Sequence, residues 1–432
     1  MRDRVGSPRR LLLISRELPP AIGPHPIRVA KLAKYLPAFG WRPTILTVPV
    51  DHAWATDDTL LADLDGIDVI RVPRLLSRVA PPATGNRGTG TRAHDAGTGT
   101  RARTGLARRL LLPDRDVLWA IPAARAAARL ADRFDAVMTT APPFSTHLVG
   151  YWLSRRHGLP WLAEYRDNWS MNPLYRRRAP AGPLDRAIEA RLLARADGIV
   201  TVSSAAAAEI LGTFPKTGGK LHVAANGFDP DDLPVLVKRS PFFEIAYAGT
   251  LGEARHPRAL LEALRSLSVS VPRLGETLRL RLMGNVSTSI AEAAVASLGR
   301  ERVMIDGLVP HREALGRAAG SAVLLGITTR AEAGGVGLTS KLFEYIGLRR
   351  PILMLAPPGP ARALVDDLAG GRTADPDDVE AIAQAVRRLF EEWSAGTERT
   401  ASPERLEPLT RRATAAAVAV ALDACVAGHR LS

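Results

Sequence analysis

Lys341 and Glu344 are the side chains whose types and spacing best suit the binding of a phosphorylated ligand. They stand in a Gly-Leu-Thr-Ser-Lys-Leu-Phe-Glu sequence that starts at Gly337, where Thr339 or Ser340 is a good N-cap for a helix. The first turn of a helix offers free backbone N–H groups and a partial positive charge, to which Lys341 adds a full one. One turn later, the Glu344 carboxylate is placed to accept hydrogen bonds from a ribose diol. A capped helix with a solvated Glu344 is the alternative that involves no ligand.

A second glycine-containing turn follows a strand that we expect at 245–248. The sequence Tyr-Ala-Gly-Thr-Leu-Gly places Gly249 and Thr250 directly after this strand, and a glycine there lets a ligand approach the backbone. Arg255 or Arg258, shortly afterwards, offers the planar fork that binds a diphosphate through two hydrogen bonds. An ordinary strand-to-helix turn explains the same residues without a ligand.

A third turn, at 306–310, follows another expected strand. It reads Asp-Gly-Leu-Val-Pro, and the backbone groups of Gly307 and Leu308 are suited to recognising the edge of a base. Open parallel sheets bind ligands at the carboxyl ends of their strands, which is where these turns are expected. The sequence has no Walker A loop, no Gly-x-Gly-x-x-Gly fingerprint and no His-Glu-x-x-His motif.

The elements that must position these residues alternate between strands and helices. In the N-terminal half, short apolar runs predict strands at 11–15, 44–48, 69–72, 136–140, 161–164 and 199–202. In the C-terminal half they predict strands at 245–248, 278–283, 303–305, 322–327 and 351–355. Such alternation indicates an α/β fold with parallel sheets and helices on both faces.

Two α/β domains of similar size follow from this pattern. We expect an N-terminal domain at 1–232 and a C-terminal domain at 240–404, joined by a polar linker within 226–240. Residues 80–105 are almost purely Gly, Thr, Arg, Ala and Pro. This segment has too little apolar surface to offset the entropy lost on ordering, and we expect a mobile loop.

Composition excludes several classes of protein. The 432 residues are 46% hydrophobic and 24% charged, which excludes a mainly disordered, collagen-like or coiled-coil chain. The single cysteine, Cys425, forms neither an internal disulfide nor a cysteine-based zinc site, and it favours a reducing compartment. No apolar run reaches the roughly eighteen residues that span a bilayer. We therefore expect a cytoplasmic protein.

The charge of the chain is strongly basic and unevenly distributed. There are 58 basic and 44 acidic side chains, a net charge of +14, and from Arg71 to Arg133 thirteen Arg and four Asp give +9. Such a field attracts anionic lipid, phosphorylated substrates or nucleic acid, and a solvated arginine-rich surface is the alternative. Nucleic acid is the weakest of these hypotheses, because the stretch lacks interleaved aromatic residues and a known binding module.

Motifs in both halves of the chain resemble glycosyltransferase family 4. The N-terminal motifs are Pro-Pro-x-x-Gly at 19–23 with the helix sequence at 28–36, Pro-Pro-x-Ser-x-His at 142–147, Tyr-Arg-Asp-Asn-Trp at 165–169, Thr-Val-Ser at 201–203 and Asn-Gly-Phe-Asp at 226–229. The C-terminal motifs are Tyr-Ala-Gly-Thr-Leu at 247–251, Met-Gly at 283–284, Lys-Leu-Phe-Glu-Tyr at 341–345 and Arg-Pro-Ile-Leu at 350–353. Their order and spacing carry the resemblance. It implies the GT-B architecture, in which two Rossmann-like parallel-sheet domains face each other across a cleft, and a C-terminal helix, here 408–428, completes the N-terminal domain.

The resemblance implies a retaining, metal-independent transfer of a sugar from a UDP- or GDP-linked donor to a hydroxyl acceptor. No cofactor is implied beyond this substrate. Arg255 and Lys341 would offset the charge of the departing diphosphate, and His147 is the third catalytic candidate. The implied donor-binding residues are Gly23, Gly249, Thr250, Gly284, Gly307, Leu308, Thr339, Ser340 and Glu344. The implied acceptor-side residues are Arg166, Asp167 and Asn226.

Two of these assignments have structural alternatives. His147 is also consistent with a helix residue packed against the sheet, and Arg166 with Asp167 is also consistent with a buried ion pair behind the site. The resemblance further implies synthesis of a cell-surface polysaccharide, a glycolipid or a glycosylated metabolite. A lipid-linked acceptor and peripheral contact with the anionic inner face of the membrane would agree with the basic N-terminal domain.

Three positions depart from the family pattern. Val336 stands where many relatives have the first of two glutamates, Thr250 where many have arginine, and Thr139 and Thr140 where many have histidine. These departures support a second hypothesis, a catalytically impaired protein that binds a nucleotide sugar or a partner. A third, a nucleotide-sugar epimerase of the same architecture, relies on carboxylates in the cleft that this sequence does not offer.

Overall fold

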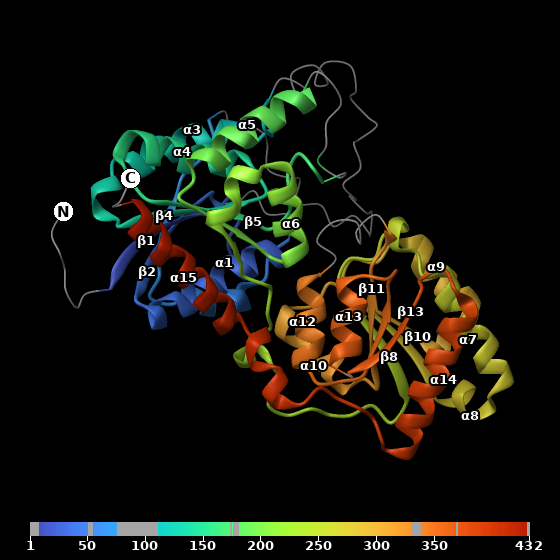
Figure 1. The fold of residues 1–432 in the computed structure, drawn as a ribbon. Helices are drawn as coiled ribbons and strands as arrows, with labels where there is room; N and C mark the ends of the chain where they lie inside the picture. The colour runs from blue at the N-terminus through green and yellow to red at the C-terminus, as the bar shows by residue number, and fades with distance from the viewer. Residues whose placement is uncertain are drawn as a thin grey trace. The chain divides into compact units, whose positions relative to one another are not determined.

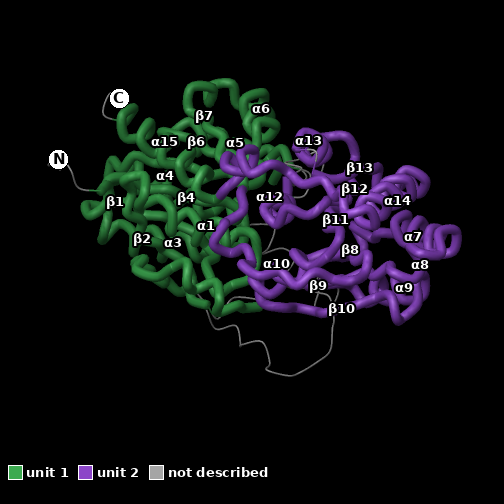
Figure 2. The backbone as a smooth tube through the Cα atoms, turned by 90° about the horizontal axis from the view of Figure 1, so that it is seen from below, with its two compact units in different colours: residues 1–84, 96–226, 411–432 green, residues 85–95, 227–410 purple. Residues whose placement is uncertain are grey.

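The protein is described by a computed structural model, in two compact units. The structure describes residues 8–50, 55–75, 111–172, 175, 181–330, 338–368 and 370–429. Unit 1 holds the described residues before Gly227 together with those from Arg411 onward, and unit 2 holds the described residues of Gly227–Thr410 (Figure 2). The loop expected at 80–105 and the departure at Val336 lie outside the described residues.

Unit 1 is built on a parallel sheet of seven strands in the order β3-β2-β1-β4-β5-β6-β7 among the residues described. The strands are β1 (Arg9–Ile14), β2 (Trp41–Thr47), β3 (Asp68–Arg71), β4 (Ala136–Ala141), β5 (Trp161–Tyr165), β6 (Gly198–Thr201) and β7 (Leu221–Val223). The order reverses beside β1, because β2 pairs with one of its edges and β4 with the other. Ligands of open parallel sheets bind at such a reversal.

Helices cover both faces of this sheet. They are α1 (Pro24–Tyr35), α3 (Val117–Ala128), α4 (Ser145–His157), α5 (Ala181–Arg195), α6 (Ser204–Thr213) and α15 (Arg411–His429), with short helical turns η1 (Leu36–Phe39), η3 (Asp58–Leu64), η4 (Ala131–Arg133) and η5 (Pro215–Lys220). The alternation of side chains along β1 explains the two faces: Leu12 and Ile14 belong to one core cluster, and Leu11 and Leu13 to the other.

The C-terminal helix α15 packs on unit 1 although it follows unit 2 in the sequence. Figure 1 shows α15 beside β1. Its residues Val418, Leu422 and Cys425 join the same core cluster as Leu11 and Leu13 of β1. Gly198 in β6 allows this close approach, since a β-carbon there would lie 2.4 Å from the Cys425 sulfur. Unit 1 is thus assembled from two segments of the chain that are far apart in sequence.

Unit 2 is a second parallel sheet, of six strands in the order β10-β9-β8-β11-β12-β13 among the residues described. The strands are β8 (Phe243–Ala248), β9 (Leu278–Met283), β10 (Val303–Gly307), β11 (Val323–Ile327), β12 (Ile352–Leu355) and β13 (Gly371–Ala374). The central strands β8 and β11 are buried throughout most of their length, which fits their continuous apolar sequences.

Helices cover both faces of the second sheet as well. They are α7 (Arg258–Ser270), α8 (Pro272–Thr277), α9 (Thr288–Leu298), α10 (His311–Gly320), α12 (Ser340–Gly347), α13 (Pro360–Asp367) and α14 (Val379–Ala395), with short turns η6 (Pro230–Asp232), η7 (Glu253–Arg255), η8 (Arg300–Arg302), η9 (Pro403–Arg405) and η10 (Glu407–Leu409). Residues of α7, α9 and α14 share one core cluster, and residues of α10, α12 and α13 share the other. Both units therefore have the expected Rossmann-like arrangement, with a parallel sheet between two helical layers.

Candidate functional site

The Lys341 ammonium lies at the carboxyl end of β8, over the ring of Tyr247. Its Nζ atom is 3.8 Å from the centroid of that ring, a distance at which the ring quadrupole attracts a cation. Among the described residues, no carboxylate forms an ion pair with Lys341. The ammonium therefore keeps its charge available to an anion at the start of α12.

Glycines make room for this arrangement. Gly249 has a φ of 136°, and a β-carbon there would lie 2.3 Å from the Nζ atom of Lys341. Gly284, with a φ of 105°, is equally restricted, since its β-carbon would lie 2.4 Å from the carbonyl oxygen of Gly249. The Gly284 N–H donates to the Gly307 carbonyl at 2.6 Å. The three glycines thus pack the ends of β8, β9 and β10 tightly together.

Arg255 contacts the same turn. The Tyr247 hydroxyl donates to the Thr250 carbonyl at 2.7 Å, and Nη1 of Arg255 donates to that carbonyl at 3.4 Å. Thr250 is exposed and Arg255 is half-buried. The structure therefore brings the two predicted cations, Lys341 and Arg255, to the turn that follows β8.

Helix α12 begins where the sequence predicts. Thr339 occupies the N-cap position and Ser340 the first turn, but the Thr339 side chain makes no capping hydrogen bond within the part of the chain that the structure describes. The helix is held to the sheet by Tyr345, whose hydroxyl accepts from the N–H of Ala248 at 2.8 Å. Because the side chain does not cap the helix, its first N–H groups retain their capacity to bind an anion.

Glu344 faces a histidine that the sequence analysis did not single out. Nε2 of His311 lies 3.7 Å from a carboxylate oxygen of Glu344 and 4.0 Å from one of Asp232. His311 is the first residue of α10, directly after the turn that holds Gly307 and the half-exposed Leu308. The only sequence signal for it was its place after that turn.

Unit 1 has its own polar cluster at the carboxyl edge of its sheet. Arg28 and Glu164 form an ion pair of 2.8 Å, with side chains only 2% and 0% exposed. Burial alone would raise the pKa of Glu164, but the positive charges of Arg28 and Arg166 hold it below its ordinary value. Asn226 accepts from Arg28 at 3.0 Å and from Arg411 at 3.1 Å through the same oxygen. The structure therefore places Asn226 between two guanidinium groups, at the point where α15 joins the unit.

Arg166 and Asp167 do not form an ion pair with each other. Arg166 donates to the carbonyls of Ala141, at 3.1 Å, and of Pro142. Its Nη1 atom is buried and has no hydrogen-bond partner among the described residues. Asp167 accepts from the Tyr175 hydroxyl at 3.2 Å, and burial raises the pKa of this aspartate. The alternative of a buried ion pair between the two residues is therefore wrong. Each residue makes its own polar contacts after β5.

His147 is completely buried under the sheet. The indole N–H of Trp161 donates to the Thr139 hydroxyl at 2.8 Å, and that hydroxyl lies 2.8 Å from Nδ1 of His147. The Thr139 hydroxyl thus joins Trp161 and His147 in one buried polar chain. Burial, and then the charge of Arg166, lower the pKa of His147 to about 3. These contacts favour the packed-helix interpretation over a general acid or base.

Gly23 ends the loop after β1, and His25 is the second residue of α1. Gly23 is the N-cap residue of α1 and has a φ of 147°. His25 is half-buried, and burial together with the charges of Arg166 and Arg28 holds its pKa well below the ordinary value. The sequence analysis did not single out His25. It did single out Gly23, in the proline- and glycine-rich loop that precedes this histidine.

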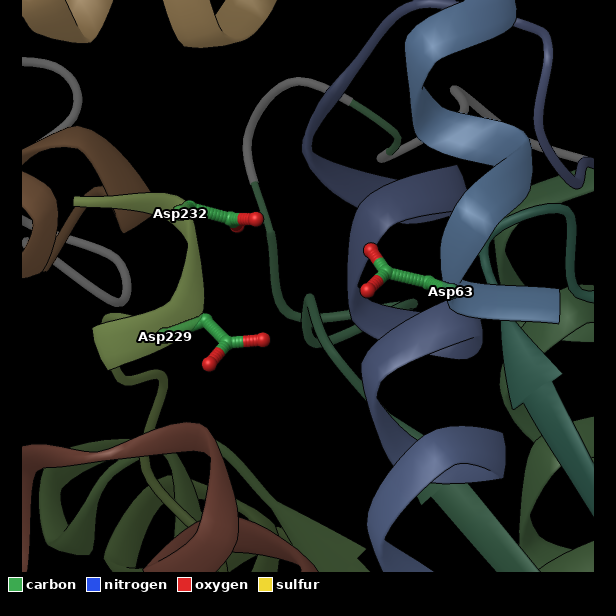
Figure 3. A group of neighbouring side chains, drawn as sticks. All are labelled: Asp63, Asp229 and Asp232. Atoms are coloured by element: carbon green, nitrogen blue, oxygen red, sulfur yellow. The ribbon is translucent and has the colours of Figure 1, made fainter. Parts of the chain in front are cut away.

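Figure 3 shows three aspartates, Asp63, Asp229 and Asp232, whose carboxylate oxygens are of the type that binds metal ions. Asp229 and Asp232 project from η6 of unit 2, and Asp232 pairs with Arg312 at 3.4 Å. Asp63 belongs to η3 of unit 1, where Lys31 lies 2.7 Å away. Asp63 and Asp232 thus have cationic partners within their own units, and we assign no metal to these residues.

Comparisons with known proteins agree with this geometry. Residues 27–232 match the model of Glycosyltransferase Family 4. The fold is shared by sucrose-phosphate synthase from Thermosynechococcus elongatus, with 16% identity over 96% of this chain and 98% of that one and a TM-score of 0.66. It is shared by a glycosyltransferase from Rickettsia africae, with 14% identity over 97% and 96% of the two chains and a TM-score of 0.59.

Staphylococcus aureus MnaA, solved with UDP, also has this fold, with 14% identity over 94% of each chain and a TM-score of 0.54. No curated protein matches the sequence. Within the described part of the chain, every helix is too short or too polar to cross a bilayer. Residues 27–232 thus resemble glycosyltransferase family 4, and the two parallel-sheet units give the chain the GT-B fold.

Proposed function

We propose that this protein is a retaining glycosyltransferase that moves a sugar from a nucleotide-sugar donor to a hydroxyl acceptor. One observation carries the proposal: the Lys341 ammonium lies at the start of α12 without a carboxylate partner among the described residues, at the glycine-lined ends of β8 and β9. A fixed cation beside free helix N–H groups suits a diphosphate. The match of residues 27–232 to the model of Glycosyltransferase Family 4 supports the same reaction class.

The donor would lie along the carboxyl edge of unit 2. Its diphosphate would contact Lys341, Arg255 and the backbone near Gly249, Thr250, Thr339 and Ser340. Glu344 would accept hydrogen bonds from the ribose hydroxyls, and the backbone of Gly307 and Leu308 would contact the base. Gly284, whose φ of 105° restricts it to glycine, would keep the floor of this site open. The UDP bound to Staphylococcus aureus MnaA, which has the same fold, favours a uridine or a related nucleotide.

The proposed reaction exchanges one bond at the anomeric carbon of the sugar for another. The bond from that carbon to the diphosphate oxygen breaks, and a bond to the acceptor oxygen forms on the same face. The acceptor proton passes to a phosphate oxygen of the leaving diphosphate, and Lys341 with Arg255 stabilises the negative charge that develops there. No carboxylate pair is required, in contrast to glycoside hydrolases.

The acceptor would bind unit 1 near the ends of β1 and β5. Gly23 ends the loop after β1, and Arg166 presents a buried guanidinium nitrogen that has no partner among the residues described. Asp167, beside it, would accept a hydrogen bond from the hydroxyl. Asn226, held by two arginines, would act by fixing α15 rather than by touching the acceptor. We place the reaction in the cytoplasm, with a polysaccharide, glycolipid or metabolite as product.

A second candidate function is binding of a nucleotide sugar without transfer. It is favoured by the burial of His147, whose pKa of about 3 keeps it neutral, and by Thr250 in place of a third cation. Both candidates predict nucleotide binding, so turnover separates them.

The experiment that tests the proposal measures donor hydrolysis, which needs no known acceptor. The full chain is incubated with UDP- and GDP-linked sugars in the presence of EDTA, and released nucleoside diphosphate is quantified. We expect release from one donor class, reduced at least tenfold in Lys341→Met and unchanged in Arg387→Gln, an exposed control on α14. Nucleotide binding without release of nucleoside diphosphate favours the second candidate. A protein that neither binds a nucleotide nor releases nucleoside diphosphate contradicts both candidate functions.

A further inference from the structure

Helices α3, α4 and α5 form one continuous outer layer of unit 1. They lie side by side on the same face of the sheet, where Trp119, Leu153 and Leu193, one from each helix, belong to a single core cluster (Figure 1). Because their apolar sides all face this core, their opposite sides all point away from the sheet. We call this outer surface the α3–α4–α5 layer.

The exposed charges of the α3–α4–α5 layer are of one sign. Its acidic residues, Asp185 and Glu189, are only 2% and 0% exposed. Its exposed arginines are Arg125, Arg129, Arg155, Arg156, Arg186 and Arg191, counting Arg129 at the end of α3. The next exposed acid along the chain is Asp132 in η4, and Arg133 follows it directly. A helical layer without an exposed carboxylate presents a positive surface to any partner.

None of these arginines forms an ion pair among the described residues, although the charge of Arg186 acts on the buried Glu189. Arg155 and Arg191 instead donate to the same hydroxyl, that of Tyr151, at 3.3 and 3.0 Å. Two guanidinium groups thus converge on a neutral oxygen, although they repel each other. Such a pair has most of its donors available for a phosphate, whose geometry matches the guanidinium fork.

The outer helices of unit 2 differ from this layer. Arg265 of α7 and Arg387 and Arg388 of α14 are exposed, but exposed glutamates, Glu262 and Glu391, share those helices. The single sign of charge is therefore a property of the α3–α4–α5 layer rather than of every helix in this arginine-rich chain.

Large apolar side chains stand among the arginines. Ile121, Trp152 and Leu184, one from each helix, are 43%, 38% and 49% exposed. Trp152 is three and four residues before Arg155 and Arg156, so all three share one side of α4. Tryptophan surrounded by basic residues is the combination that lies at the interface between lipid headgroups and hydrocarbon.

We propose that the α3–α4–α5 layer docks on an anionic membrane surface. The inference specifies the membrane contact that the basic N-terminal domain suggested, and it can hold whether or not the donor site of the proposed function does. Two copies of this positive layer would repel each other. The phosphate groups of anionic lipids attract its arginines, and the boundary between headgroups and hydrocarbon suits Trp152. Stabilisation of helix C-termini by arginine accounts for Arg155 and Arg156, but not for the missing exposed carboxylates or the exposed tryptophan.

The test measures partition of the full chain onto vesicles by co-sedimentation. Vesicles of pure phosphatidylcholine are compared with vesicles that contain roughly 30% phosphatidylglycerol. We expect binding to the anionic vesicles only, weakened as salt rises from about 0.1 M to about 0.5 M. The triple variant R155Q/R156Q/R191Q should lose about 100-fold in partition, because each basic residue near such a surface contributes about fivefold.

A matched control removes the same charge from unit 2. The variant R265Q/R387Q/R388Q, altered on the neighbouring helices α7 and α14, should keep partition within about threefold of the unchanged protein. Equal losses in the two triple variants, or none in the first, would overturn the assignment of the layer. If the protein does not bind anionic vesicles, the proposal that a membrane is its partner is wrong. An acidic protein would then be the alternative partner. Nucleotide binding by the same variants should be unchanged, which separates this inference from the proposed function.

Discussion

The ammonium of Lys341 occupies the space that a side chain on Gly249 would need. A β-carbon at Gly249 would lie 2.3 Å from Nζ and 2.7 Å from Cε of Lys341. Two motifs that are about ninety residues apart in sequence thus meet at one point, where β8 ends and α12 begins. The relationship explains why glycine follows Ala248 and why a long cationic side chain stands in the first turn of α12.

Gly249→Ala should therefore weaken nucleotide binding. The added methyl group would displace the ammonium, and a φ of 136° strains any residue other than glycine by about 1–3 kcal/mol. We expect the dissociation constant of the preferred nucleoside diphosphate to rise about tenfold or more, measured by isothermal titration calorimetry. Gly252→Ala is the matched control, since a β-carbon there meets no atom of the described residues within 4 Å. Equal effects of the two substitutions on the dissociation constant would show that Gly249 does not belong to the nucleotide-binding site.

The buried pair of Arg28 and Glu164 should be essential to the stability of unit 1. Replacing Arg28 alone by methionine leaves a carboxylate that is 0% exposed without its 2.8 Å partner, which should lower the free energy of unfolding by about 3–5 kcal/mol. The double variant R28M/E164L removes both charges and should recover a large part of the loss. Urea unfolding of both variants checks this. A double variant as unstable as the single one would mean that lost packing, and not the unpaired charge of Glu164, causes the loss of stability.

Glu189 should make stability depend on pH. Burial raises its pKa from 4.5 to about 7, so between these values the folded state holds a proton that the unfolded state has released. Stability contributed by the neutral carboxyl is complete below pH 4.5 and is lost as the pH rises to about 7. Glu189→Gln should therefore be more stable than the unchanged protein at pH 8, by on the order of 3 kcal/mol.

The same substitution should have only a small effect near pH 4.5, where the carboxyl is neutral in the folded state and about half protonated in the unfolded state. Glutamine keeps an oxygen for the Ser170 N–H, which donates to Glu189 at 3.0 Å. Urea unfolding at the two pH values measures the difference directly. A difference that does not change with pH would contradict the raised pKa.

The central strands of both sheets could be predicted from sequence because short continuous apolar runs are typical of strands that are buried on both faces. Two edge strands, β7 and β13, were missed, since both are short and half-exposed and lack such runs. The donor-side glycines were predicted from their position after strands. The contacts of Asn226 were not, because they depend on Arg28 and Arg411, which are 198 and 185 residues away in sequence. His147 looked functional from its motif, and only its complete burial and contact with Thr139 show its packing role.

The central claim is that Lys341 binds the diphosphate of a nucleotide sugar. Isothermal titration of UDP and GDP, each beside its nucleoside, into the unchanged protein and Lys341→Met tests it most directly, with EDTA present. The account predicts that one nucleoside diphosphate binds, that its affinity falls about tenfold to 100-fold in the variant, and that nucleoside affinity stays the same. Undiminished diphosphate binding by Lys341→Met would contradict the account, as would failure of both nucleotides to bind the unchanged protein.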